Sequence, residues 1–363
     1  MGEIVQAAFR ARPFVSIVIT SYNYDQYLSA TIESALGQSY PRKEVIVVDD
    51  GSTDLSREII KSFGSRCIGV FRDNGGEAAA SRSGLDVSHG DIVLFLDSDD
   101  LLDRDAVERV VAAWRPGCAK VQFYLRVIDG GGTPLGCRKP NIDFVPGDQI
   151  RTCLFQYGYY PSPPTSGNAY SRAFLTDVLP LTIGAWRDGI DGYLNGLAPL
   201  HGEIVSLPIE LGCYRMHDRN MSAWSDLSLS KLRDGMLREI ERERAIVDHA
   251  ALRGIRIRHA LVTNIPSHCK ARILSLRLDP KSHPIEGDTL PGLFGLGIAA
   301  VWRFPHMALA KRFGSSVGLA ALLVLPRSWL DRWLHALFVA ERRPRLADFL
   351  PPCARRPIER SSA

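Results

Sequence analysis

The sequence has no Cys-x-x-Cys pair, although it contains 7 cysteines among 363 residues. The cysteines are odd in number and scattered, which argues against a disulfide framework and against a structural zinc site. A reducing compartment such as the cytoplasm is therefore the expected location. Residues 1–12 also lack an apolar segment of signal-peptide length, so we do not expect secretion.

Long hydrophobic runs are missing as well. The uncharged runs at 290–302 and 313–326 have about 13 and 14 residues, fewer than the roughly 18 to 20 that cross a bilayer. No internal repeat and no low-complexity segment is present. Since 45% of the residues are hydrophobic, the chain can bury a substantial core, and its length favours two or three domains.

A short apolar run at 92–96 ends in three carboxylates within four positions: Asp97, Asp99 and Asp100. Unpaired buried carboxylates are costly, so this pattern calls for a cation. A hard divalent ion such as Mg²⁺ or Mn²⁺, shared with phosphate oxygens, would suit these oxygen ligands. The alternative is that the polar residues cap a helix that begins near Asp103.

The first third of the chain alternates between two patterns. Strand-like apolar runs and helical segments follow one another at 14–20, 28–36, 44–50, 55–63, 67–71, 75–87 and 91–97. This alternation predicts βαβ units and a mostly parallel sheet. Ligands bind beyond the carboxyl ends of such strands. The polar loops 20–23, 49–52 and 97–100 all follow strand ends, so we expect them to form one site.

The second half of the sequence is less regular. Strands are expected at 121–127, 204–207 and 212–217, and helices at 147–157, 169–179, 188–200 and 227–252. The last of these helices is amphipathic and carries opposite charges at close spacing.

Three motifs in this order resemble family 2 glycosyltransferases with the GT-A fold: SIVITSYN at 16–23, VVDDGSTD at 47–54 and FLDSDD at 95–100. The likeness is close over the first third and continues more weakly through 165–170 and 214–220. It implies an α/β, Rossmann-like sheet flanked by helices. The expected domains are a GT-A catalytic domain over 1–225, with a nucleotide-sugar-binding half (1–115) and an acceptor half (116–225), followed by a helical C-terminal extension over 226–363.

The resemblance implies three donor-binding residues at the strand ends. Thr20 and Tyr22 would line the base and ribose pocket, and Asp50 would accept a hydrogen bond from the nucleobase. The chemistry agrees, because a carboxylate and an aromatic ring at adjacent strand ends can bind a base edge and stack on its face. The alternative for Tyr22 is an aromatic side chain packed within its loop.

Arg82 lies in a segment, 78–85, that is similar to the family's Ala-Arg-Asn-x-Gly helix, with Ser83 where Asn is usual. The resemblance implies that its guanidinium contacts the diphosphate or orders the metal-binding loop. A solvated surface arginine is the alternative.

The Asp97-Ser98-Asp99 segment matches the family's Asp-x-Asp motif. The implied role is to hold Mg²⁺ or Mn²⁺ against the two phosphates of the donor. Asp99 would be the direct ligand and Asp97 would contact ribose, metal or both. His217 resembles the family's C-terminal histidine, a further metal or phosphate contact, and a structural histidine is the alternative. Asp100 has no required role in this chemistry, and we expect it to cap a helix.

An inverting transfer needs one base on the acceptor side, which deprotonates the attacking hydroxyl. By the resemblance, Asp191 lies where family members carry this base, at the start of a helix. Asp188 is the rival. Either aspartate could instead only cap that helix.

The implied activity is inverting, metal-dependent transfer of a single sugar from a nucleoside-diphosphate sugar to a hydroxyl acceptor. The acceptor would be a saccharide or a lipid-linked molecule, in cell-surface polysaccharide or glycolipid assembly. The Gln-x-x-Arg-Trp motif of processive synthases is absent, which favours single transfer. A nucleotidyltransferase acting on a sugar phosphate and a non-catalytic nucleotide-sugar-binding module are the alternatives. No nucleic acid partner is expected.

The C-terminal tail is basic. From Pro291 onward, Lys and Arg number 11 against 4 acids, whereas the formal charge of the whole chain is only +4. Apolar helices flanked by cations, with Trp329 and Trp333 beside them, predict peripheral contact with an anionic membrane. The expected location is then the cytoplasm, at the inner face of the cytoplasmic membrane. Packing of these helices on the catalytic domain is the alternative.

Overall fold

The computed structural model describes residues 12–179, 189–217, 220, 229–257, 265–303, 307, 309–327 and 329–330. The chain divides into two compact units. The first comprises Met1–His217 and Gly235–His268, and the second comprises Asp218–Asp234 and Cys269–Ala363. The expected domain boundary between 225 and 226 lies outside the described residues.

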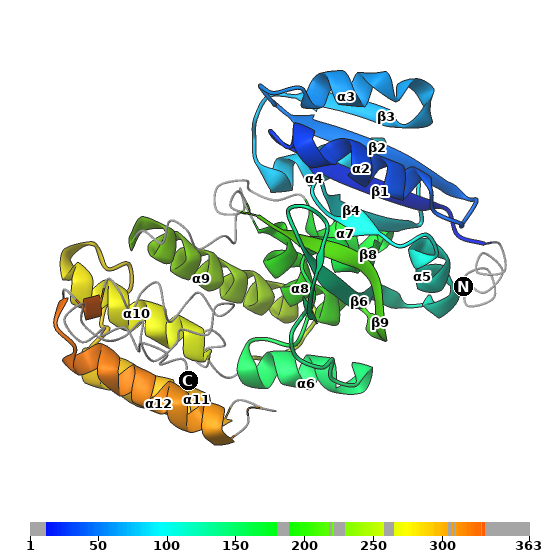
Figure 1. Cartoon of the computed structure of the whole chain (residues 1–363). Coiled ribbons are helices and arrows are strands. Elements are labelled where there is room, and N and C mark those ends of the chain that lie inside the picture. The colour runs from blue at the N-terminus through cyan, green and yellow to red at the C-terminus, as the bar shows by residue number, and fades with distance from the viewer. Residues whose placement is uncertain are drawn as a thin grey trace, which may run out of the picture. The chain divides into compact units, whose positions relative to one another are not determined.

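Four neighbouring parallel strands form the N-terminal half of the sheet, in the order β3-β2-β1-β4 (Figure 1). Their bounds are Val15–Ser21 (β1), Lys43–Asp50 (β2), Ile68–Arg72 (β3) and Ile92–Asp97 (β4). The apolar runs of β1, β2 and β4 are buried on both faces, as expected for strands covered by helices on each side. The predicted βαβ pattern is therefore confirmed, and β1, β2 and β4 end at one edge.

Three helices connect these strands: α2 (Asp25–Leu36), α3 (Ser56–Ser62) and α4 (Glu77–Val87). Helix α4 carries small residues on its buried face. At Gly84 an added Cβ would lie 2.3 Å from Val18 Cγ1 of β1, so the absence of a side chain lets the helix lie close to the sheet.

The sheet continues through five further strands in the order β8-β6-β9-β5, with β7 paired to β6. Their bounds are Leu101–Leu102 (β5), Cys118–Asp129 (β6), Pro134–Lys139 (β7), Asn168–Ser171 (β8) and Glu203–Met216 (β9). Strand β8 runs antiparallel to both β4 and β6, whereas β6 and β9 are parallel. The sheet is thus mixed, and the expected parallel arrangement holds for its first four strands.

Two sequence-based boundaries were wrong in this half. The helix expected at 169–179 is strand β8 followed by α7 (Arg172–Val178), because the Ser171 hydroxyl caps the helix by accepting from Phe174 N at 3.1 Å. The two strands expected at 204–207 and 212–217 are one strand, β9. Its pairing with β6 is shifted between Phe123 and Tyr124 and again before Arg126, and such bulges interrupt the apolar alternation that marks a strand.

The remaining helices of the first unit are α5 (Ala106–Ala113), α6 (Gly147–Tyr157) and α8 (Ile190–His201), with a 3-10 turn, η2, at Thr165–Gly167. Helix α9 (Leu229–Leu252) and α10 (Pro266–Leu278) each contribute residues to both units. Helix α10 was not expected from the sequence.

The second unit contains α11 (Leu290–Arg303) and α12 (Leu309–Val324). They pack closely at Gly297, where an added Cβ would lie 3.1 Å from the Leu319 methyl groups. Among the described residues, every helix is too short or too polar to span a membrane.

Candidate active site

The loops that follow β1 and β2 are tied together by side chains. Asn23 adopts a left-handed conformation (φ 59°), which Asn tolerates better than most residues. Its backbone N donates to Ser52 Oγ at 2.9 Å, and its side-chain Oδ1 accepts from Thr53 N at 2.8 Å. Asp54 Oδ2 accepts in turn from Asp25 N at 3.0 Å. These bonds hold the two predicted donor-binding loops in one fixed arrangement.

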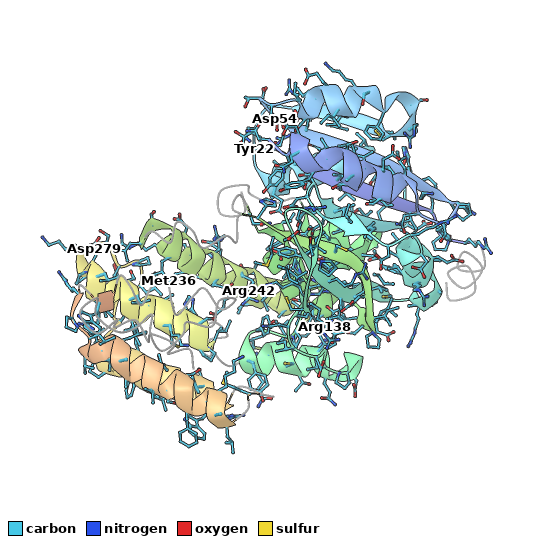
Figure 2. The ribbon with its side chains drawn as sticks, viewed as in Figure 1. Tyr22, Asp54, Arg138, Met236, Arg242 and Asp279 are labelled. Atoms are coloured by element: carbon cyan, nitrogen blue, oxygen red, sulfur yellow. The ribbon has the colours of Figure 1, made fainter. Side chains whose placement is uncertain are left out.

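Tyr22 is 47% exposed and lies at the same end of the N-terminal strands as Asp54 (Figure 2). The alternative for Tyr22, a side chain packed within its loop, would leave the ring less exposed than this. Thr20 lies in β1 directly opposite Asp97 of β4 in the parallel register. Thr20, near the end of β1, and Tyr22, just beyond it, therefore lie at the edge where β4 ends.

Asp50 is buried at the end of β2 and its carboxylate is held by the chain itself. It accepts hydrogen bonds from Gly75 N at 3.0 Å and Gly76 N at 2.7 Å, and it pairs with the Arg72 guanidinium. The Arg72–Gly76 segment thus closes over the end of β2, a contact that the sequence analysis missed. The position of this segment after the end of β3 could have identified it, because the other three loops were predicted from the same kind of position. The predicted bond from Asp50 to a nucleobase would use a remaining lone pair.

Arg82 of α4 points along its own helix. Its Nε donates to Asp86 Oδ1 at 2.8 Å, and both side chains are about half exposed. Among the described residues this guanidinium pairs with Asp86, and the predicted diphosphate contact stays a prediction.

Carboxylates gather beyond the end of β4. We call Glu77, Asp97, Asp99, Asp100 and Asp191 the acidic cluster. The pKa of Asp97 is raised well above its usual value, first by burial and then by the charges of Glu77, Asp100, Asp99 and Asp191. Residues from β4, α4 and α8 are therefore close enough to repel one another electrostatically. The sequence analysis missed Glu77, which follows the β3 end by the length of a short loop.

Asp100 does not cap a helix, which corrects the sequence-based expectation. Helix α5 begins at Ala106, with Asp105 before it. The Asp100 carboxylate is fully buried and accepts from Ser166 Oγ at 2.6 Å and from Arg215 N at 2.8 Å. It therefore joins the turn η2 and strand β9 to the loop 97–100.

His217 lies against the loop 97–100. Its Nε2 is 2.9 Å from Asp99 Oδ2. The imidazole stacks on Tyr27, with ring centroids 4.9 Å apart, and lies 5.6 Å from the Tyr24 ring. Arg215 supports the same region because its Nε donates to Asp99 O at 2.8 Å and its guanidinium lies over Tyr27. The orientation of His217 is thus fixed by two tyrosines of α2 and its preceding loop.

The donor set at this point fits a divalent cation that is shared with a ligand. No group of three His, Cys, Asp or Glu side chains arranged to hold a metal occurs within the described part of the chain. The Asp99 oxygen and His217 nitrogen are 2.9 Å apart, about the separation of two adjacent ligands around an octahedral ion at roughly 2.1 Å. Mg²⁺ is commonly held by one or two side chains together with substrate phosphates and water. Asp99 and His217, with other carboxylates beside them, therefore fit a cation of this kind.

Asp191 lies in the first turn of α8. The residue that precedes this helix, Gly189, has a left-handed conformation with a φ of 81°. Asp191 Oδ1 accepts from Gly192 N at 2.8 Å, and Gly189 N donates to Glu77 Oε2 at 2.7 Å. Burial raises the pKa of Asp191, while the Gly192 bond and the Lys120 charge oppose this rise. A raised pKa makes a carboxylate a better proton acceptor, which is the property that a general base needs. The rival Asp188 lies outside the described residues.

A buried polar network behind Asp191 anchors α8 to the sheet. Lys120 of β6 is fully buried, and its Nζ donates to Asn195 Oδ1 at 2.6 Å. The Tyr170 hydroxyl lies 3.2 Å from the same oxygen, and the Tyr160 hydroxyl donates to Asn195 O at 2.9 Å. Desolvation lowers the pKa of Lys120 well below its usual value. This network holds the helix that carries Asp191, and the sequence analysis did not identify it.

The described residues also contain a cavity of about 400 Å³ between α6 and the start of β9. Its lining residues are Gly147, Asp148, Ile150, Arg151, Thr152, Pro199, Gly202, Glu203 and Ile204. None of the acidic cluster is among them, so the strand-end site does not depend on this cavity.

Comparisons with known proteins agree with the motifs. The family described as "Glycosyl transferase family 2" matches residues 16–160. An uncharacterized glycosyltransferase of Nostoc sp. is 33% identical over 221 residues, which cover 59% of this chain and 69% of that protein. A Bacillus subtilis protein named for teichuronic acid biosynthesis, the glycosyltransferase TuaG, is 39% identical over 102 residues, 27% of this chain and 40% of TuaG.

Among solved structures, S. aureus TarS 1-349 in complex with UDP-GlcNAc shares 15% identity with a TM-score of 0.48, over 84% of this chain and 90% of that one. The likeness is too distant to carry an argument. The expected α/β fold, with flanking helices and a helical C-terminal region, is present. With the extended match to the Nostoc protein, the chain belongs to glycosyltransferase family 2.

Proposed function

We propose that this glycosyltransferase is an inverting, metal-dependent enzyme that transfers one sugar from a nucleoside-diphosphate sugar to a hydroxyl acceptor. The observation that carries the proposal is the acidic cluster: burial raises the pKa of both Asp97 and Asp191, and the charges of the other four carboxylates of the cluster raise that of Asp97 further. Such an arrangement is stabilised by a bound cation and by the positive charge that develops at an anomeric carbon.

On the donor side, Tyr22 would stack on the base, Thr20 and Asp97 would face the ribose, and Asp50 would accept from the base. Arg82 would contact the diphosphate. Asp99 and His217 would hold Mg²⁺ or Mn²⁺, and Asp97 would lie beside it. When bound, this ion would neutralise the negative charge that collects on the departing nucleoside diphosphate.

On the acceptor side, Asp191 would take the proton of the attacking hydroxyl. The hydroxyl oxygen forms a bond to the anomeric carbon as the bond from that carbon to the diphosphate oxygen breaks, which inverts the configuration. Burial favours this role because it raises the pKa of Asp191 and so makes its carboxylate a better proton acceptor. The network of Lys120 and Asn195 would keep α8, and hence Asp191, in place.

The first test is the substitution Asp191→Asn. We expect it to lower the transfer rate by at least about 100-fold, since a general base commonly contributes 10²–10⁴-fold, while the donor still binds. Glu58→Gln is the matched control, because it neutralises an exposed carboxylate in the first turn of another helix, α3. Normal turnover by Asp191→Asn would rule this residue out as the base and direct attention to Asp188.

The second test identifies the donor and the metal together. Thermal unfolding is measured with nucleoside diphosphates and their sugars, each with and without Mn²⁺ or Mg²⁺. We expect one nucleotide sugar to raise the melting temperature and the metal to increase that rise. Equal shifts with and without metal would contradict metal dependence, and binding without turnover on any acceptor would favour the non-catalytic alternative.

The acceptor class is part of the proposal. TuaG, named for teichuronic acid biosynthesis, supports a role in cell-surface polysaccharide or glycolipid assembly. A lipid-linked acceptor would be met at a membrane, at its cytoplasmic face, where the basic C-terminal region would make peripheral contact.

A further inference from the structure

Helix α12 exposes an apolar face. Leu309, Phe313, Val317 and Val324 are 66%, 59%, 67% and 80% exposed. At about 100° per residue these four positions fall within an arc of roughly 80° on the helix. The opposite side, which includes Leu319 and Leu322, is buried. The helix therefore has two apolar sides, of which only one is used in packing among the described residues.

Helix α11 extends this exposed surface. Trp302 and Leu296 are large apolar residues that remain exposed on α11. The Trp302 ring meets the Phe313 ring edge to face, with centroids 5.3 Å apart and planes at 90°. We call Trp302, Leu309, Phe313, Val317 and Val324 the apolar face. Exposed apolar residues that gather in this way mark an interaction surface.

The charged residues of α11, α12 and the segments beside them all have one sign. From Thr289 to Leu330 the sequence contains no Asp or Glu, but it contains Arg303, Lys311, Arg312 and Arg327. Arg303 and Lys311 are exposed near the start of α12, and Arg327 is exposed just beyond its end. A partner of this surface should therefore combine a large apolar interior with negative charge, which is the chemistry of an anionic bilayer.

We propose that the apolar face lies in the interface of an anionic lipid bilayer, with α11 and α12 parallel to the membrane surface. The helices have 14 and 16 residues, or about 21 and 24 Å, so they are too short to cross a hydrocarbon core of about 30 Å. Trp302 and Trp329 suit the headgroup level, where tryptophan is enriched. This binding requires neither donor nor acceptor and so does not depend on the proposed transfer reaction.

The test is co-flotation of the full-length protein with vesicles, without nucleotide sugar. One set of vesicles contains phosphatidylcholine alone and the other also contains phosphatidylglycerol. We expect flotation with the anionic vesicles, and at least about a tenfold loss of binding in Phe313→Ser/Val317→Ser, because two buried apolar side chains are removed from the interface. Leu135→Ser/Leu252→Ser is the matched control, since both leucines are exposed elsewhere, and it should float like the wild type.

A second variant, Arg303→Glu/Lys311→Glu, should lose the preference for anionic vesicles, since it replaces two cations that an anionic surface attracts with two anions that it repels. Circular dichroism confirms that each variant is folded. The proposal is overturned if the wild type fails to float, or if Phe313→Ser/Val317→Ser floats as well as the wild type. It is also overturned if these two substitutions instead dissociate a dimer in sedimentation, because the face would then bind a second copy of the chain.

Discussion

Buried carboxylates occur in both units, but their surroundings differ. In the acidic cluster of the first unit, the pKa of Asp97 is raised because burial and four neighbouring carboxylates disfavour its charge. In the second unit, burial also raises the pKa of Asp288, but hydrogen bonds from Arg272 and His283 outweigh it and hold that pKa below its usual value. The charges that shift the pKa of Asp97 are all negative, whereas Asp288 is paired with an arginine and a histidine.

The second arrangement, which we call the paired cluster, has a pattern that could be mistaken for a catalytic triad. His283 Nδ1 is 3.1 Å from Ser275 Oγ, and His283 Nε2 is 2.9 Å from Asp288 Oδ2. Ser275 is fully buried, however, and Asp288 is also paired with Arg272. The comparison teaches that a buried carboxylate paired with cations supports the fold, whereas a buried carboxylate whose pKa is raised by other carboxylates is a candidate for ligand binding.

The largest effect should come from breaking the paired cluster. Asp288→Asn is expected to lower the free energy of unfolding by roughly 3–5 kcal/mol, because it leaves the Arg272 charge buried without its partner. Chemical denaturation measures this change. Glu33→Gln, which removes the exposed partner of Arg66, should change the free energy of unfolding far less, because water screens an exposed ion pair. Equal losses in the two variants would show that the Arg272–Asp288 pair is not special.

The paired cluster also predicts a dependence on pH. The folded pKa of Asp288 is depressed, so its stabilising contribution is fully present above the unfolded pKa of about 3.9 and is lost as pH falls through the folded pKa. The difference in stability between wild type and Asp288→Asn should therefore shrink below about pH 4. Denaturation curves collected at several pH values test this. A stability difference that persists at the lowest pH would show that it does not arise from the ionised form of Asp288.

Neutralising the acidic cluster should have the opposite sign. Asp97→Asn is expected to raise the free energy of unfolding of the ligand-free protein by roughly 0.5–2 kcal/mol, since it removes one of several repelling carboxylates. Donor binding in the presence of Mn²⁺ should weaken in the same variant. A destabilised Asp97→Asn protein would mean that these carboxylates are already compensated, and the contrast between the clusters would fail.

The smallest effect is expected at Arg82. Its ion pair with Asp86 is exposed and four residues apart on one helix, so Arg82→Ala should change the free energy of unfolding by no more than about 0.5 kcal/mol. Isothermal titration with the donor then separates the two interpretations of this residue. Unchanged donor affinity would make Arg82 a surface arginine and remove it from the proposed diphosphate contacts.

Local patterns predicted the elements of the first third with small errors. The strands β1, β2 and β4 are mostly apolar and bounded by polar turns, so their type and ends are encoded in adjacent residues. Later elements were less predictable. Strand β8 has four residues and lies between two strands that run the other way, and no local pattern records which neighbours a short strand will have.

The candidate site shows the same division. Parallel strands end at one edge, so the meeting of residues 20–23, 49–52 and 97–100 follows from the order of elements along the chain. By contrast, Glu77 resembles an ordinary acid in a helix start, and Lys120 resembles any polar residue in a strand. Their roles depend on partners 112 and 75 residues away in the chain, at Gly189 and Asn195.

The sequence by itself determined the family, the βαβ order of the first third and the edge of the sheet at which the donor motifs meet, because each is encoded in contiguous residues. Tertiary structure alone decided that Asp100 joins a turn to a strand, that Asp50 is held by Arg72 and two glycine amides, and that Asp97 lies among other carboxylates. Burial and charge depend on which distant residues surround a side chain, and that arrangement exists only after the chain has folded.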